Sequence, residues 1–498
     1  MNKYNLEKQH AYGKYHAIER IYLLVDKGSF EEIGSRITNY GYEEGNGRKR
    51  VAYDGVITGS GRINGEKVFI FSQDFTVNGG TLGLHHGKKI SHLMQLAIKS
   101  KCPLIGVYDS GGARINEGVN ALAGCGEMMY YNVLASGYIP QISVVVGPCA
   151  GAAAYSPAIT DFVFMVEGVS SMFITGVDVV KSVTGEETTP QELGGAKVHT
   201  QKSGVAHFIY KKEKECYQAV RQLISILPSS CDVQRRTKES AYIEKDVTDL
   251  VNIVPENELK IYDMRDVILK FIDTDSFIEV YQKFAPNMVA GFARLSGMTI
   301  GIVANQPNVN CGSIDCDSSD KAARFVRFCD SFNIPIVTLV DTPGYLPGIS
   351  QEHNGIIRHG AKLLYAYAEA TVPKVTVILR KAYGGAYIAM GSKHLGTDFV
   401  YAWPKAEIAV MGAEGAVLIL NKKEINELQD IEKEAYIQQK IDEYKEKYIN
   451  ANIAVQEGYV DEIVEPSNMR KKIFSSLSIL SMKTEYVSIY KKHGNIPL

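Results

Sequence analysis

The sequence predicts an α/β protein made of two tandem copies of one fold, related by internal duplication. Short β-branched runs alternate with segments of helical periodicity, as in layered α/β proteins. Identical residues recur between the two halves at a nearly constant offset, which indicates an internal repeat. Each half also contains a buried strand that runs directly into a turn of glycine and alanine. Together these observations favour two similar domains.

The repeat is visible in pairs of identical residues. Pairs 232 positions apart are Arg62/Arg294, Gly65/Gly297, Lys89/Lys321, Pro103/Pro335 and Asp109/Asp341. Pairs 233 positions apart are Gln73/Gln306, Gly79/Gly312 and Pro140/Pro373. We expect the copies to join within the polar segment Ser229–Asp246, and we predict domains at 1–235 and 247–498.

In the first half, periodicity and turn signals place the elements in order. The predicted elements are a charged helix at 5–26, a polar loop at 41–50, a strand at 51–57, an Asn-Gly hairpin at 62–68, a buried strand at 68–71, a helix at 88–100, a strand at 104–108, a helix at 118–136 and a strand at 142–146.

The second half repeats the alternation and adds a charged extension. The predicted elements are a helix at 321–333, a strand at 336–340, a strand from 372 into a turn at 384–386, a charged helical stretch at 421–450, and a turn with an edge strand at 458–464. The charged stretch is typical of a solvated helix with one buried face, and a docking site is the less favoured alternative.

The composition excludes several classes of partner. The 498 residues are 45% hydrophobic and 22% charged, with a formal net charge of -2, as in a globular protein of two or three domains. This balance argues against nucleic acid or an anionic membrane as a partner. No apolar run reaches membrane-spanning length, and no signal or transit pattern opens the chain. The eight cysteines lack C-x-x-C spacing, so we expect reduced thiols, no metal site and a cytoplasmic location.

The two glycine and alanine turns are the candidate sites of chemistry. In the repeat register Gly151-Ala152-Ala153 lies opposite Gly384-Gly385-Ala386. A strand–turn–helix junction of small residues exposes backbone N–H groups, and two such donors aimed at one point form an oxyanion hole. Two holes would suit group transfer between two carbonyl compounds. The alternative for each turn is tight packing of a strand against a helix, but recurrence in register favours function.

Other catalytic patterns are poorly represented. The sequence contains no G-x-S-x-G elbow, no P-loop and no H-E-x-x-H motif. The pair His85-His86 could hold a ligand phosphate, although a structural role is favoured. Asp109 and Asp341 each end a strand and could be general bases, or could cap the next element.

Long motifs resemble one family. They include Phe71-Ser72-Gln73-Asp74-Phe75, Asp109-Ser110-Gly111-Gly112-Ala113-Arg114, Ser203-Gly204-Val205-Ala206-His207, Ala322-Ala323-Arg324-Phe325 and Ile356-Ile357-Arg358-His359-Gly360. The chain resembles the carboxyltransferase (β) subunits of biotin-dependent acyl-CoA carboxylases, and above all those of propionyl-CoA carboxylases. It is also similar to the α subunits of methylmalonyl-CoA decarboxylases.

The resemblance implies two crotonase-like domains, with the active site between the N-domain of one subunit and the C-domain of another in a hexamer of three dimers. It implies that biotin arrives on a carrier domain, that a biotin carboxylase is a partner, and that an acyl-CoA binds mainly to the N-domain. No metal is implied. Carboxybiotin would release CO2, biotin would remove the α-proton, and the thioester enolate would attack CO2.

The same resemblance assigns roles to residues. The hole for the thioester oxygen would use Gly151 and Ala152, and the hole for the biotin ureido oxygen would use Gly385 and Ala386. The substrate-binding residues would be Ser110, Gly111, Gly112, Ala113, Arg114, Ala150, Tyr155 and Ile388. The biotin-binding residues would be Gly344, Tyr345, Tyr383 and Gly384.

The chain departs from the family in one hole. Where the family usually has Cys-Ala-Gly-Gly-Ala, this chain has Cys149-Ala150-Gly151-Ala152-Ala153. Alanine keeps its N–H, so we expect the hole to survive with a changed acyl pocket. The apolar Ile388 is compatible with short acyl groups such as acetyl and propionyl.

Two alternative functions remain open. One is a decarboxylase α subunit that moves a carboxyl group from a malonyl-type thioester to biotin. The other, much less favoured, is a scaffold without turnover, which would predict disrupted turns.

Overall fold

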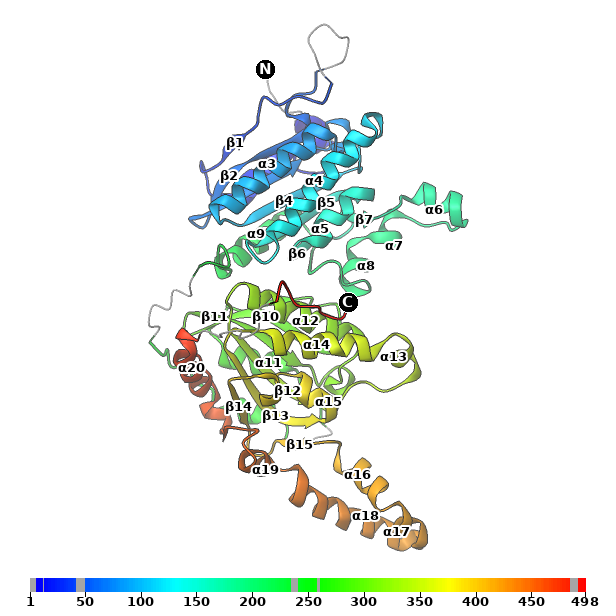
Figure 1. Ribbon diagram of the computed structural model, residues 1–498, viewed down its shortest axis with the longest axis vertical. Coiled ribbons are helices and arrows are strands. Elements are labelled where there is room, and N and C mark those ends of the chain that lie inside the picture. The colour runs from blue at the N-terminus through cyan, green and yellow to red at the C-terminus, as the bar shows by residue number, and fades with distance from the viewer. Residues whose placement is uncertain (1–5, 12, 42–49, 234–240, 258–259, 484–490) are drawn as a thin grey trace. The chain divides into compact units, whose positions relative to one another are not determined.

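A computed structural model describes residues 6–11, 13–41, 50–233, 241–257, 260–483 and 491–498. The chain forms two compact units, Met1–Gln234 and Arg235–Leu498. Each unit contains one sheet with helices on its faces (Figure 1). The predicted α/β class with two similar halves is therefore confirmed.

The sheet of the first unit has the strand order β1-β2-β3-β4-β5-β6-β8, and β7 also pairs with β5. Strands β1 to β3 are antiparallel, and the strands from β3 to β8 run parallel. The strands are β1 (Glu31–Ile33), β2 (Val56–Ile63), β3 (Glu66–Gln73), β4 (Leu104–Ser110), β5 (Gln141–Ala150), β6 (Phe162–Val166), β7 (Ser171–Phe173) and β8 (Phe208–Tyr210).

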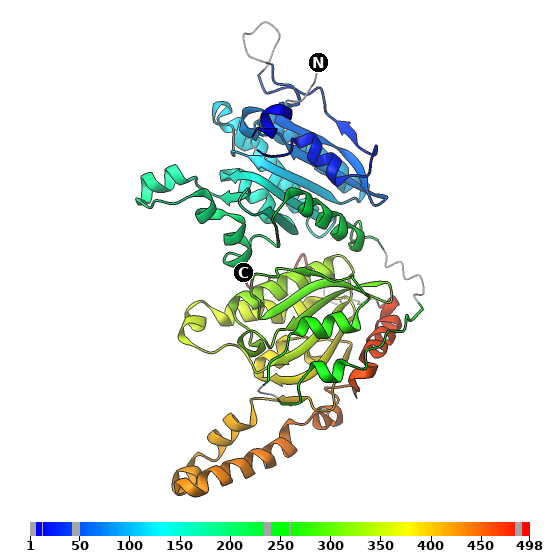
Figure 2. The ribbon, with the colours of Figure 1, turned by 180° about the vertical axis from the view of Figure 1, so that it is seen from behind.

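Helices cover both faces of this sheet. Helices α3 (Leu84–Ser100) and α4 (Val119–Ala135) lie together on one face, and the core of the unit lies beneath them. Helices α2 (Ala17–Leu24) and α9 (Glu213–Ile226) pack on the opposite face (Figure 2). The shorter helices are α1 (Leu6–His10), α5 (Tyr155–Ile159), α6 (Val177–Thr184), α7 (Pro190–Gly194) and α8 (Ala196–Gln201).

The second unit repeats this plan. Its sheet has the order β16-β14-β13-β12-β11-β10-β9, and β15 also pairs with β13. The strands are β9 (Ile278–Val280), β10 (Met288–Leu295), β11 (Met298–Asn305), β12 (Ile336–Thr342), β13 (Lys374–Tyr383), β14 (Phe399–Ala402), β15 (Glu407–Ala409) and β16 (Glu462–Ile463).

Helices α12 (Cys316–Ser331) and α14 (Ile356–Glu369) pack together in the second unit, while α11 (Met264–Phe271) and α20 (Met469–Ile479) also contact the sheet. Three helices form an arm that projects from this unit (Figure 1): α16 (Ala413–Leu420), α17 (Lys422–Glu427) and α18 (Asp430–Tyr444). The remaining helices are α10 (Leu250–Ile253), α13 (Ile349–His353), α15 (Gly384–Ala389) and α19 (Ala451–Gln456).

The strand register confirms the duplication. In the first unit Leu104 of β4 pairs with Gln141 of β5. In the second unit Ile336 of β12 pairs with Lys374 of β13, 232 and 233 positions later. Both pairs of strands also carry an irregularity at the same place, as described below.

Two of the predicted residue pairs are wrong. Because β2 pairs with β3 as β10 pairs with β11, Gln73 corresponds to Asn305 rather than to Gln306. The turns Asn78–Gly80 and Asn310–Gly312 likewise make Gly80, not Gly79, the counterpart of Gly312. The offset between the copies is 232 up to β12 and 233 from β13 onward. The second copy therefore has one more residue than the first in the segment between β12 and β13.

Two elements near the start of the chain also differ from prediction. The single helix at 5–26 is divided, because His16 caps a new helix by accepting a hydrogen bond from the Ile18 N–H. The strand predicted from residue 51 begins at Val56, since Tyr53 and Asp54 adopt left-handed backbone conformations in a short turn. Most of the polar loop predicted at 41–50 lies outside the described residues.

The other predicted elements are found. The Asn-Gly hairpin joins β2 to β3, with positive φ at Asn64 and Gly65, as a type I′ turn requires. The charged stretch 421–450 is helical, and Ile425 and Ile441 are buried.

Candidate functional site

Two strand–turn–helix junctions are the candidate site. The first junction comprises Ala150–Tyr155 after β5, and the second comprises Tyr383–Ile388 after β13. Gly151 and Gly384 occupy the same register position, with φ of 60° and 59°. No side chain of the described residues caps either turn. The first N–H groups of each helical turn have no intrahelical acceptor, so both junctions can donate to an oxygen.

Glycine is required at the start of each turn. A φ near 60° places the backbone in the left-handed region that β-carbon substituents disfavour. A Cβ added to Gly384 would lie 3.1 Å from the carbonyl oxygen of Val410. The sequence thus specifies the bend that directs the N–H groups outward.

A second loop lies beside each turn. After β4, Gly112 has a φ of 104°, and a Cβ there would lie 2.8 Å from the Ala150 carbonyl oxygen. In the second unit the ring of Tyr345 lies 3.6 Å from the Cβ position of Gly385. The structure therefore brings the predicted Gly111-Gly112-Ala113 beside the first junction, and Gly344-Tyr345 beside the second.

Three predicted site residues direct their side chains into the protein instead. Arg114 is buried and forms ion pairs with Asp54 at 2.6 Å and with Glu117 at 2.7 Å. The others are Ser110 and Tyr383. The buried Ser110 hydroxyl accepts a hydrogen bond from the Gly112 N–H, and the Tyr383 hydroxyl donates to Glu407. Their polar groups bind within the protein and support the loops.

Side chains of the first junction differ in exposure. Ala152 is half-buried and packs against the core of the first unit. Tyr155 is 49% exposed, and Ile388, at the equivalent position of the second junction, is 40% exposed. These two residues present side chains of different chemistry at the same place in the two copies.

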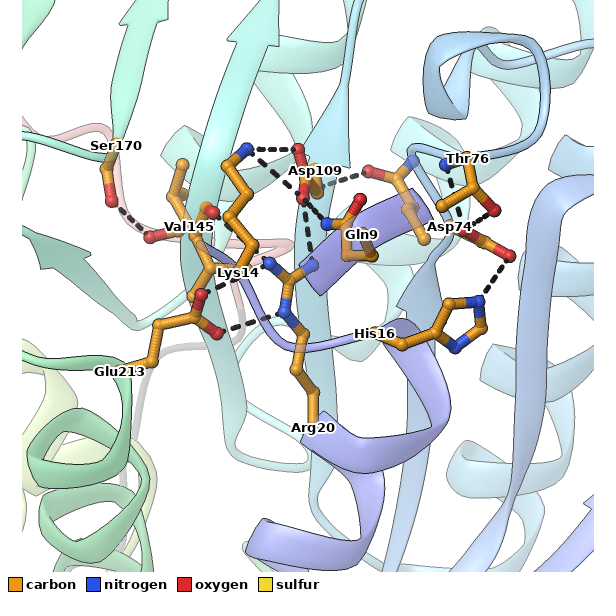
Figure 3. A network of polar contacts seen from close by, with 12 residues as sticks. Gln9, Lys14, His16, Arg20, Asp74, Thr76, Asp109, Val145, Ser170 and Glu213 are labelled. Atoms are coloured by element: carbon orange, nitrogen blue, oxygen red, sulfur yellow. Dashed lines mark hydrogen bonds and ion pairs between the residues drawn. The ribbon is translucent and has the colours of Figure 1, made fainter. Parts of the chain in front are cut away.

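Neither strand-ending aspartate is placed to act as a general base. Asp109 is fully buried and binds Arg20, Lys14 and Gln9 (Figure 3). Asp341 is fully buried and binds Arg380 and Tyr262. Burial raises the pKa of Asp341, against the opposing effect of Arg380. Both carboxylates hold the fold together, and neither caps the following element.

The histidine pair is structural. His86 is fully buried, with ring nitrogens near the Asp54 carbonyl oxygen and the Gln73 amide. Burial and the nearby Arg114 lower the pKa of His86 to about 3. His85 approaches the Thr38 carbonyl oxygen. The pair is therefore not placed as a phosphate site.

Two tyrosine hydroxyls at the second junction have no hydrogen-bond partner among the described residues. The hydroxyls of Tyr345 and Tyr387 are buried without one. Burial raises the pKa of both to about 12, so both are neutral donors. Buried hydroxyls are rarely left unpaired, so these two are candidates for binding a ligand. The resemblance identified Tyr345, but no sequence signal marked Tyr387, which is one residue beyond the predicted turn.

The described part of the chain lacks two further kinds of site. No cluster of histidine, cysteine, aspartate or glutamate there could hold a metal ion. None of the described helices has the length and apolar character needed to cross a membrane.

Known proteins are similar to this chain over nearly its whole length. A family model described as the carboxyl transferase domain matches residues 8–496. The propionyl-CoA carboxylase beta chain of Cereibacter sphaeroides is 51% identical over 99% of this chain and 96% of its own length. The methylmalonyl-CoA decarboxylase subunit alpha of Propionigenium modestum is 49% identical over 99% of this chain and 95% of its own. The transcarboxylase 12S structure with methylmalonyl-coenzyme A bound, described as a hexamer assembly, has a TM-score of 0.94 and 48% identity. It covers 99% of this chain and 94% of that one.

Proposed function

Because the chain belongs to the carboxyl transferase family, we propose that each of its two junctions binds one reactant of a single reaction. That reaction is the transfer of a carboxyl group between biotin and a short-chain acyl-CoA. The chain is an acyl-CoA carboxyltransferase subunit with two tandem crotonase-like domains, as the sequence predicted. The observation that carries the proposal is the recurrence of one left-handed glycine turn at the same register in both units.

The first junction would bind the thioester. The N–H groups near Gly151 and Ala152 would donate to the thioester oxygen and stabilise the negative charge that develops when the α-proton leaves. Gly112 leaves backbone space beside this turn, and the exposed Tyr155 would contact the acyl-CoA. We assign this site to a domain spanning residues 1–235.

The second junction would bind biotin, in a domain spanning residues 247–498. The N–H groups of Gly385 and Ala386 would donate to the ureido oxygen. The unpartnered hydroxyls of Tyr345 and Tyr387 fit a group rich in hydrogen-bond acceptors. Biotin, when bound, supplies the carboxyl group and the base, so the chain itself needs no side-chain nucleophile.

A second candidate is the reverse transfer, from a malonyl-type thioester to biotin. It is supported by the decarboxylase relative, whose identity is close to that of the carboxylase relative. The junction geometry serves both directions, because an oxygen bound in the forward reaction is the same oxygen bound in reverse.

We also propose the partners that the reaction requires. A biotin carboxylase and a biotin carboxyl carrier subunit would charge and deliver biotin, and a homohexamer with its active site at a dimer interface would pair the two junctions. Exposed apolar residues on and before α4 support association with further protein: Ile115, Val119, Leu122, Tyr130 and Val133. The eight free thiols support a cytoplasmic location.

A direct assay tests the proposal. The purified protein is mixed with a carboxybiotin-charged carrier and, separately, with acetyl-, propionyl- and butyryl-CoA. Carboxylated product is expected with at least one of them, and the reverse assay uses the malonyl-type products. Absence of transfer with all three in both directions would defeat the proposal.

A further inference from the structure

Two buried aspartates occupy equivalent irregularities in the two sheets. The ladder between β4 and β5 is interrupted at Asp109, between the paired residues Tyr108 and Ser110. The ladder between β12 and β13 is interrupted at Asp341, between Val340 and Thr342. Each aspartate directly precedes the loop that lies beside a junction, so its position affects the geometry of that junction.

In the second unit an arginine from the adjacent strand holds the aspartate. The Arg380 Nε lies 3.0 Å from Asp341 Oδ2. Its Nη1 donates to the carbonyl oxygens of Lys260 at 2.8 Å and Asn257 at 3.1 Å. This one side chain joins the ends of β12 and β13, and both it and the Asp341 side chain are almost fully buried.

In the first unit glycine stands where Arg380 stands in the second. Gly147 occupies that register position in β5, and a Cβ there would lie only 1.9 Å from Asp109 Oδ1. The space that a side chain would take is used by residues from the start of the chain. Arg20 Nη1 lies 2.9 Å from Asp109 Oδ2, and Lys14 Nζ lies 3.2 Å from Oδ1.

Arg20 also reaches β5 and α9 (Figure 3). Its Nη2 donates to the Val146 carbonyl oxygen at 3.4 Å, in the strand that leads to the first junction. Its Nε lies 3.0 Å from Glu213 Oε2, and Tyr217 donates to the same carboxylate at 2.8 Å. The side chains of Arg20 and Asp109 are fully buried. The contacts of Arg20 thus join β4 and β5 as those of Arg380 join β12 and β13.

We propose that Arg20 is a positioning residue for the first junction and supplies from α2 the contact that Arg380 makes from within β13. In both units a buried arginine binds the strand-ending aspartate and so connects two neighbouring strands, although the arginine comes from a different part of the chain in each. This recurrence indicates that the junction requires the contact. The inference rests on the proposed function, because its effect on catalysis is exerted through Asp109 and Val146 on the Gly112 loop and the Gly151 turn.

The test separates this role from simple stabilisation. Arg20→Met removes this contact but also leaves two buried carboxylates with fewer cationic partners, so it lowers stability. Arg20→Met combined with Glu213→Gln removes one positive and one negative charge together, which restores the charge balance. Arg470→Met is the control, since Arg470 is equally buried but binds Asp273 and the Phe271 carbonyl in the second unit.

The double variant is expected to regain thermal stability relative to Arg20→Met while kcat stays low. The expected loss in kcat is on the order of 10- to 100-fold with little change in KM, since misplacement of about 1 Å has effects of that size. Arg470→Met should lose stability without this loss in kcat per folded molecule. Recovery of wild-type kcat together with stability in the double variant would overturn the proposal.

A second measurement does not depend on turnover. Hydrogen exchange of peptides covering Ser110–Arg114 and Ala150–Tyr155 should accelerate in both Arg20 variants and remain unchanged in Arg470→Met. Unchanged exchange in the Arg20 variants would also overturn the positioning role. A wild-type protein without transfer activity would instead overturn the proposed function, and exchange would still decide the role of Arg20.

Discussion

Lys89 and Lys321, which are 232 positions apart, bind the same backbone turn in the two units. Lys89 Nζ donates to the Tyr53 carbonyl oxygen at 2.9 Å, and Lys321 Nζ donates to that of Ala285 at 3.1 Å. Tyr53 and Ala285 are themselves 232 positions apart and have φ of 46° and 44°. The identity of these two residues is therefore explained by a buried ammonium that fixes a left-handed turn.

Replacing either lysine by methionine should destabilise its unit. The carbonyl oxygens that lose a donor stay buried, which costs about 1–3 kcal/mol. Chemical denaturation of Lys321→Met and Lys89→Met measures the free energy of unfolding. Lys88→Met is the matched control, because Lys88 is the exposed neighbour and should change stability by less than about 0.5 kcal/mol. Equal effects of Lys88→Met and Lys89→Met would contradict the assignment.

His86 should make the protein less stable in acid. The folded-state pKa of about 3 lies below the ordinary value of 6.5, so the unfolded state binds more protons between these limits. The contribution of neutral, buried His86 to the free energy of unfolding is fully present above pH 6.5. It is lost as the pH falls toward 3, at up to about 1.4 kcal/mol per pH unit. His86→Gln should flatten this dependence in thermal melts, and substitution of the exposed His92 by Gln is the matched control. An identical slope in His86→Gln and wild type would show that the ring does not titrate in this way.

Local signals in the sequence predicted most of the fold, and long-range contacts explain the exceptions. The Asn-Gly turn, the β-branched strands and the recurrent offset each depend on residues close in the chain or on a simple repeat. The division of the first helix depends on the cap that His16 makes, and helical periodicity does not reveal it. The register error at Gln73 arose because a chance identity with Gln306 lay one residue from the true counterpart, Asn305.

The site was predictable where it depends on backbone and not where it depends on side-chain partners. Gly151 and Gly384 are recognisable, since only glycine suits their φ. Arg114 matches a family motif, but its guanidinium forms an ion pair with Asp54, which lies 60 positions away in the sequence. The motif alone does not reveal this partner. The sequence around Gly147 does not indicate why a glycine stands there. The reason is visible only by comparison with the second copy, where Arg380 occupies the same register position and binds the aspartate.

Ala152→Gly should change acyl-chain preference. The methyl group packs against the core of the first unit, so its removal should let the turn re-angle and reshape the adjacent acyl pocket. A shift of the turn that changes the room for the acyl group by one methylene would alter discrimination on the order of 10-fold. Comparison of kcat/KM for acetyl-, propionyl- and butyryl-CoA measures the effect. An unchanged ranking and spacing of the three values would refute a role in selectivity.

Tyr345→Phe and Tyr387→Phe should weaken biotin binding without loss of stability. Neither hydroxyl has a hydrogen-bond partner in the described part of the chain, so removing it leaves no described group unsatisfied. The KM for the carboxybiotin carrier should rise by about 2- to 10-fold in each variant, the effect of one net hydrogen bond. Tyr367→Phe is the control for a structural hydroxyl, because Tyr367 binds the Thr338 hydroxyl at 2.8 Å and should lose stability with no change in this KM. A loss of stability in the first two variants would assign them the same structural role.

The division of labour between the junctions is tested most directly by titration calorimetry of Gly151→Ala and Gly384→Ala. Each substitution strains one left-handed turn by about 1–2 kcal/mol and leaves the other turn intact. Gly151→Ala should weaken binding of propionyl-CoA about 10-fold and leave binding of the biotin carrier domain unchanged, and Gly384→Ala should do the reverse. If each variant weakened both ligands equally, the two junctions would not serve separate reactants.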